Sequence, residues 1–125
     1  MKVSERAAQV WSVLALAAKN RQVLTYDIVA KLVGVPRQGL GQVLEPIQSY
    51  CMVEGLPPLT ILVVREDSGL PGAGFVAAAD IPKTQIKVFA YDWLERGAPS
   101  PEALEQAVAK MPSNGVKPAP NPPQS

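Results

Sequence analysis

The chain has 125 residues, of which 47% are hydrophobic, and this composition is typical of one globular domain with a single core. Its 12 basic and 11 acidic residues give a net charge of +1, so phosphate binding would have to come from local clusters of charge. A single cysteine and the lack of histidine exclude an internal disulfide, histidine-based catalysis and histidine metal sites. We therefore expect a cytoplasmic protein with no catalytic residue, no metal and no cofactor.

The first predicted element is a helix that begins at Ser4, a favourable N-cap residue, and ends near Asn20. Its apolar residues recur at intervals of three and four, which places Trp11 on the buried face. The apolar run carries Glu5 and Arg6 and is shorter than the ~20 residues of a membrane span. We expect neither a signal peptide nor a membrane partner.

Two short helices around a tight turn come next. Thr25 is predicted to cap a helix over 26–33, and Gly34 is suited to end it in the left-handed conformation. The turn is Val35-Pro36, and a third helix is expected from Arg37 to Leu44. The residues expected on the buried side of the 26–33 helix are Ile28, Val29 and Leu32.

The predicted 37–44 helix contains Gly39 and Gly41, each of which weakens a helix by roughly 1 kcal/mol relative to alanine. Such residues permit close approach, either of a neighbouring helix or of a DNA backbone. Pro46 predicts a kink or the start of a further helix, which Gly55 ends. Cys51 falls on the apolar side of that helix, far from basic residues, so we expect a buried and unreactive thiol.

Residues 59–64 read LTILVV, a short β-branched run that predicts a strand. A polar tip over 65–69 follows, then the glycine- and proline-rich segment 70–74, and a return strand is expected at 75–76. A hairpin of this size after a helix-turn-helix is typical of a wing. The same pattern also fits a plain surface hairpin.

Two further helices are predicted, over 85–96 after Asp80 and Pro82, and from Ser100 to about Met111. The segment 112–125 is rich in proline and is expected to be a disordered tail. The predicted fold is therefore α+β and mainly α: a winged helix-turn-helix domain over 1–111, with a short β-hairpin wing and extra C-terminal helices.

The segment from Tyr26 to Val64 resembles the C-terminal domain of the alkylguanine-DNA alkyltransferases and their alkyltransferase-like relatives. The matching pieces are TYDIVA (25–30), GVPR (34–37), GLGQVL (39–44) and the run from Pro58 through Val64 to Ser68-Gly69. The resemblance covers about a third of the chain and implies a DNA-reading winged helix. The chain also resembles a group of small bacterial proteins that have no assigned role.

The family's reactive motif, Pro-Cys-His-Arg-Val, corresponds here to Pro58-Leu59-Thr60-Ile61-Leu62-Val63-Val64. That stretch has no cysteine, histidine or arginine, so methyl transfer to a protein thiol is excluded there. The family also inserts an arginine from the second helix of the motif into the gap left by a flipped nucleotide. Either Arg37 or Gln38 occupies that place in this chain.

These observations favour a non-enzymatic DNA-binding protein, with roles in regulation or in recognition of damaged or modified bases. Its partner would be double-stranded DNA, contacted in the major groove by glutamines or, if the resemblance holds, in the minor groove. The expected DNA-binding residues are Tyr26, Lys31, Arg37, Gln38, Gly39, Gly41, Gln42 and Arg65.

The alternative is a protein–protein interaction module on the same scaffold, because a nearly neutral chain with a GLPGAGF loop suits a protein partner. An enzyme is disfavoured, since no base accompanies the hydroxyl and carboxylates of 66–68. The segment 70–74 also lacks the Gly-Lys-Ser/Thr of a phosphate-binding loop.

Overall fold

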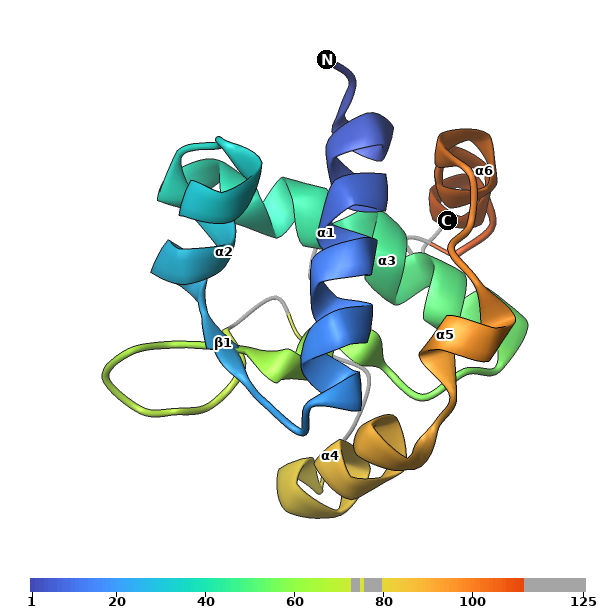
Figure 1. Ribbon diagram of the computed structural model, residues 1–125. Helices are drawn as coiled ribbons and strands as arrows, with labels where there is room; N and C mark the ends of the chain where they lie inside the picture. The colour runs from blue at the N-terminus through green and yellow to red at the C-terminus, as the bar shows by residue number, and fades with distance from the viewer. Residues whose placement is uncertain (73–74, 76–79, 112–125) are drawn as a thin grey trace, which may run out of the picture.

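The computed structural model of the protein describes residues 1–72, 75 and 80–111 (Figure 1). The elements in chain order are α1 (Val3–Lys19), β1 (Leu24–Thr25), α2 (Tyr26–Val33), the 3-10 helix η1 (Arg37–Gly39), α3 (Leu40–Glu54), the 3-10 helix η2 (Leu59–Leu62), β2 (Val63–Val64), α4 (Ile81–Ala90), α5 (Trp93–Arg96) and α6 (Pro101–Lys110). The mainly helical α+β fold is confirmed. The predicted tail, 112–125, lies outside the described residues.

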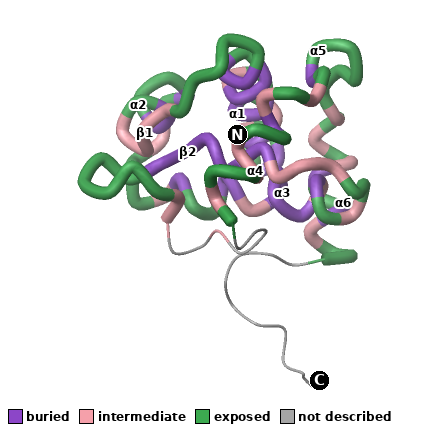
Figure 2. The backbone as a smooth tube through the Cα atoms, turned by 90° about the horizontal axis from the view of Figure 1, so that it is seen from below, coloured by how far each residue is buried: buried purple, intermediate pink, exposed green. Residues whose placement is uncertain are grey.

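The core forms where α1 packs across α3 and α6 packs against both (Figure 1). Trp11 is 1% exposed and lies at its centre, as predicted. Its ring meets those of Tyr50 and Trp93 edge-on, with centroids 5.5 and 5.6 Å apart. Edge-to-face pairs contribute about 0.5–1.5 kcal/mol each beyond the area that they bury. Figure 2 shows the buried positions of α1, α3 and β2 gathered inside an exposed outer layer.

The two ends of α1 differ from expectation in detail. Lys2 is the N-cap residue, while Ser4 is buried and donates a hydrogen bond to Glu105 of α6 at 2.9 Å, so the predicted capping role of Ser4 is wrong. At the other end Arg21 takes the left-handed conformation with φ +56°. The helix closes there because the Gln22 N–H donates to the Ala17 carbonyl at 2.9 Å. A left-handed residue other than glycine costs roughly 1–2 kcal/mol.

Helix α2 has the predicted bounds and ends. The Thr25 hydroxyl accepts a hydrogen bond from the Ile28 N–H at 3.2 Å, and Gly34 has φ +74°. The expected buried side is partly wrong: Ile28 and Leu32 are 46% and 62% exposed. Nearly the whole helix is apolar, so spacing alone did not identify the inward face. The residues that α2 buries are Val29, Ala30 and Val33.

Helix α3 is longer than predicted and contains Pro46 without a break. The chain begins this segment as η1 over Arg37–Gly39, becomes α-helical at Leu40 and ends at Gly55 with φ +68°. Of the two alternatives predicted at Pro46, the start of a further helix is therefore wrong. Proline removes only its own N–H donor and its ring crowds one carbonyl, and the buried contacts of α3 on α1 and α6 offset that cost.

The predicted strand over 59–64 is mostly wrong, because Leu59–Leu62 forms η2 and only Val63 and Val64 are extended. All four η2 residues are buried, and a short apolar run without alternation fits a buried helical turn as well as a strand. The two strands are parallel, with Leu24 opposite Val63 and Thr25 opposite Val64.

The segment expected to be a wing is a closed loop over 65–70. Val64 makes one antiparallel bridge to Pro71, and the Arg65 N–H donates to the Leu70 carbonyl at 2.8 Å. Among the described residues, no second strand follows this loop. Phe75 is not part of a strand, and Val76 lies outside the described residues. This segment is called the 65–70 loop below.

The predicted helix over 85–96 is two helices. Helix α4 begins earlier, at Ile81, with Asp80 as the N-cap, and ends at Ala90. Asp92 then accepts a hydrogen bond from the Glu95 N–H at 3.1 Å and starts α5. Helix α6 begins after its Ser100 cap, as predicted. Among the described residues, no helix is both long enough and apolar enough to span a bilayer.

Candidate nucleic-acid interface

The segment predicted to be a helix-turn-helix consists of α2, the turn 34–36, η1 and the first turn of α3. Helix α1 anchors this segment to the core, because the Arg6 guanidinium of α1 donates a hydrogen bond to the Val33 carbonyl at the end of α2. The parallel pairing of β1 with β2 holds the 65–70 loop beside the start of α2. These contacts bring most of the predicted DNA-binding residues onto one region.

Arg37 connects three segments in this region. Its Nη2 atom lies 2.6 Å from Glu66 Oε1 in the 65–70 loop, and its guanidinium lies 5.9 Å from the centre of the Tyr26 ring. The second oxygen of Glu66 accepts a hydrogen bond from the Asp27 N–H in the first turn of α2 at 3.2 Å. The Glu66 carboxylate therefore occupies the place where Arg37 and a helix N-terminus together favour an anion.

Tyr26, the first residue of α2, contacts both Arg37 and the segment 70–72. Burial raises the pKa of its hydroxyl, and a hydrogen bond from the Gly72 N–H partly offsets this increase. A Cβ atom on Gly72 would lie 2.9 Å from Tyr26 Cζ and still closer to the hydroxyl oxygen, so any larger residue there would require the tyrosine ring or the backbone to move. The tyrosine thus joins the 70–72 segment to α2, and its ring lies under Arg37.

The three predicted DNA-contacting cations are exposed, and each has a carboxylate partner. Lys31 lies 3.0 Å from Asp27, Arg37 lies 2.6 Å from Glu66, and Arg65 lies 2.9 Å from Asp67. The Arg65 hydrogen bond holds the pKa of the Asp67 carboxyl below its usual value. The region is therefore close to electrically neutral in the free protein.

The glycines of the helix-turn-helix face open space. A Cβ atom on Gly39 or Gly41 would meet no described atom within 4 Å. Packing against a neighbouring helix therefore does not explain them within the described residues.

The two predicted DNA-binding glutamines, Gln38 and Gln42, lie on different surfaces. Gln38 is exposed beside Arg37 in η1, whereas Gln42 lines a groove of about 410 Å³ between the start of α1, α3 and α6. Ser4, Pro46 and Glu105 line the same groove. Gln38 is therefore the glutamine that shares a surface with Arg37, and Gln42 borders a second surface.

The carboxylates Asp27, Glu66 and Asp67 were absent from the set of site residues predicted from sequence. A local signal existed for two of them. Asp27 stands four residues before Lys31, the spacing of a helical ion pair, and Asp67 lies two residues after Arg65. The Glu66 contact joins segments distant in sequence, so no local pattern could indicate it.

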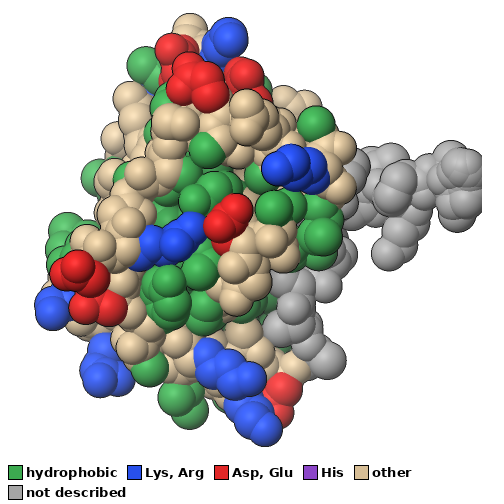
Figure 3. Space-filling view, turned by 90° about the vertical axis from the view of Figure 1, so that its right-hand side faces the viewer, with side chains coloured by type: hydrophobic (Ala, Val, Ile, Leu, Met, Phe, Trp, Pro, Cys, Tyr) green, Lys and Arg blue, Asp and Glu red, His purple; other side chains and the backbone are tan. Residues whose placement is uncertain are grey.

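The face formed by α5 and α6 mixes acidic, basic and apolar side chains, and no extended basic area is visible in that view (Figure 3). The described residues hold no group of three or more His, Cys, Asp or Glu side chains placed to bind a metal ion. No family model matches the chain, and searches of curated proteins and of solved structures find no significant match.

Proposed function

We propose that the protein binds double-stranded DNA without enzymatic activity, through α2, η1 and the first turn of α3. The observation that carries this proposal is the open space around Gly39 and Gly41, next to the exposed side chains of Arg37 and Gln38. A side-chain-poor first turn of a helix lets a phosphate backbone come close to the main-chain amides. The resemblance of the sequence to the alkyltransferase-like proteins implies a DNA-reading surface in the same segment and supports this proposal.

The ion pairs on this surface are compatible with the proposal because exposed pairs are weak. Such a pair contributes about 0–1 kcal/mol to stability, so exchanging a carboxylate for a phosphate costs the fold little. Arg37 is only half exposed and is already oriented by Tyr26 and Glu66. A phosphate that replaces the carboxylate would find the guanidinium in position.

The testing experiment is a fluorescence anisotropy titration with duplex, single-stranded and base-modified duplex DNA at two salt concentrations. Arg37→Ala should weaken duplex binding and reduce the slope of log affinity against log salt by about one unit. Lys83→Ala, an exposed cation on α4 outside the region, is the matched control and should change neither quantity. Equal affinity and slope for the Arg37→Ala and wild-type proteins would contradict the proposal.

A second candidate function is docking of a protein partner on the same scaffold. The observation that favours it is the pairing of all three cations together with the exposure of Ile28, Leu32 and Leu70, which are 46%, 62% and 53% exposed. Exposed apolar side chains beside neutralised charges are typical of protein interfaces. Absence of binding to every DNA in the titration above would favour this second function.

A further inference from the structure

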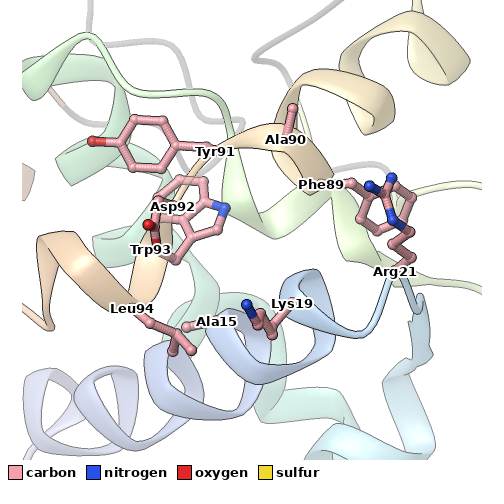
Figure 4. Close-up of a pocket in the computed structure, with 9 residues that line it drawn as sticks. All are labelled: Ala15, Lys19, Arg21, Phe89, Ala90, Tyr91, Asp92, Trp93 and Leu94. Carbon is pink, nitrogen blue, oxygen red and sulfur yellow. The ribbon is translucent and has the colours of Figure 1, made fainter.

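A pocket of about 260 Å³ opens between the C-terminal end of α1 and the α4–α5 turn (Figure 4). It shares no residue with the candidate nucleic-acid interface. Its chemically informative lining residues are Lys19, Arg21, Phe89, Tyr91, Asp92 and Trp93. The pocket therefore combines two cations with aromatic side chains from a different part of the chain.

Arg21 occupies a backbone position that ordinarily selects glycine. Its φ of +56° is left-handed, and it follows the last residues of α1 in the helix-ending turn. The backbone contacts of that turn use only main-chain atoms, so a glycine would make them equally well. Residues in strained backbone conformations concentrate at functional sites, where the function of the side chain compensates for the energetic cost of the conformation.

The two cations of the pocket have no ion-pair or hydrogen-bond partner among the described residues, unlike Lys31, Arg37 and Arg65. The one carboxylate in the lining, Asp92, already accepts a hydrogen bond from the Glu95 N–H at 3.1 Å.

Other polar groups in and beside the pocket have hydrogen-bond partners within the protein. Trp93 Nε1 donates to the Val88 carbonyl at 2.8 Å, and the Ala17 and Ala18 carbonyls at the end of α1 accept N–H groups. The Asp92 carboxylate keeps its negative charge, so the lining carries two positive charges against one negative charge, and this excess of positive charge favours an anion.

We propose that this pocket binds a phosphate group, held by Lys19 and Arg21, with Phe89 as the aromatic wall for an attached base (Figure 4). Phe89 is partly exposed. Aromatic side chains beside cations are the common arrangement for unpaired nucleotides. The volume lies below the roughly 300 Å³ at which pockets for larger ligands begin, so it suits one nucleotide at most. That nucleotide is either free or part of a single strand.

Isothermal titration calorimetry of the full chain with inorganic phosphate, adenosine monophosphate and a short oligothymidylate tests the proposal. The deciding variant is Arg21→Gly. It should weaken binding by about tenfold or more, since it removes one charge-assisted contact. It should also raise the thermal midpoint by a few degrees, since it relieves the left-handed strain. Loss of binding by a more stable protein cannot be attributed to misfolding. Lys83→Ala removes the same charge outside the pocket and should bind like the wild type.

The three probes separate the sources of the phosphate. Tighter binding of the mononucleotide than of the oligothymidylate supports a free nucleotide, and the reverse order supports a single strand. No binding of any probe to the wild type overturns the proposal. So does a lowered midpoint with unchanged binding in Arg21→Gly, which would assign Arg21 a purely structural role.

Discussion

Arg37 and Glu66, 29 residues apart in sequence, form a 2.6 Å ion pair that ties the 65–70 loop to the turn of the helix-turn-helix. Glu66 also accepts the Asp27 N–H, so one carboxylate receives both the guanidinium and a helix N-terminal amide. A DNA phosphate that used Arg37 would have to displace this carboxylate. The loop and the nucleic acid would therefore compete for the same cation.

Glu66→Gln should raise duplex affinity several-fold, because it removes the competing charge and leaves Arg37 available to phosphate. Stability should change by less than about 1 kcal/mol, since the pair is exposed. Anisotropy titration measures the affinity and urea unfolding measures the stability. Glu102→Gln is the matched control, since it makes the same change in net charge at an exposed position of α6, outside the candidate interface, and leaves Arg37 paired. Equal gains in the two variants would show that only net charge matters.

The sequence predicted those elements whose ends carry specific signals. Thr25 and Gly34 bounded α2, Ser100 started α6, and Asp80 started α4, because each makes a local contact that its residue type favours. Trp11 and Cys51 were assigned to the core because apolar spacing on a helix reports burial directly.

The errors arose where nonlocal packing decided the structure. Leu59–Leu62 became a 3-10 helix because it is buried on every side, and Pro46 stayed inside α3 because its neighbours pack on two other helices. The candidate site was predicted as a set of cations, yet its character comes from carboxylates on other segments. The partnership of Glu66 with Arg37 depends on strand pairing at Val63 and Val64, which no local pattern specifies.

Gly41→Ala should stabilise the protein and weaken duplex binding. Alanine is favoured over glycine inside a helix by about 1 kcal/mol, and a Cβ atom here meets no described atom within 4 Å. The same methyl group would stand between α3 and an approaching DNA backbone. Thermal unfolding and anisotropy should therefore change in opposite directions. Greater stability with unchanged affinity would remove Gly41 from the proposed DNA contact.

Cys51 should stay unreactive in the folded protein and make stability fall at high pH. Burial raises the pKa of its thiol from its ordinary value of 9.0 to about 12. Between these values the unfolded chain loses a proton that the folded protein keeps, so the free energy of unfolding decreases by about 1.4 kcal/mol per pH unit. Below about pH 8 the thiol is essentially neutral in both states and contributes almost no pH dependence.

Urea unfolding of the wild type and Cys51→Ala at about pH 8 and about pH 10.5 measures this effect. The difference in stability between the two proteins should shrink or reverse at the higher pH, since the variant lacks the thiol. Burial also raises the pKa of Tyr26, which lowers the free energy of unfolding at high pH as well. Both proteins contain Tyr26, so this contribution cancels in the comparison. A constant difference would show that the thiol ionises as freely in the folded protein as in the unfolded chain.

Gly72→Ala should destabilise the protein by about 1–3 kcal/mol, the usual cost of forcing an extra carbon into a packed site. The added Cβ would lie 2.9 Å from Tyr26 Cζ and closest to the hydroxyl oxygen, so the ring or the 70–72 segment must move.

Tyr26→Phe removes that oxygen, and Gly72→Ala should therefore cost less in the Tyr26→Phe background than in the wild type. Urea unfolding of the four proteins gives the coupling energy directly. Gly39→Ala, a glycine with open space around it, serves as the control and should show no such coupling. Equal costs of Gly72→Ala in both backgrounds would mean that Tyr26 does not set the requirement for glycine.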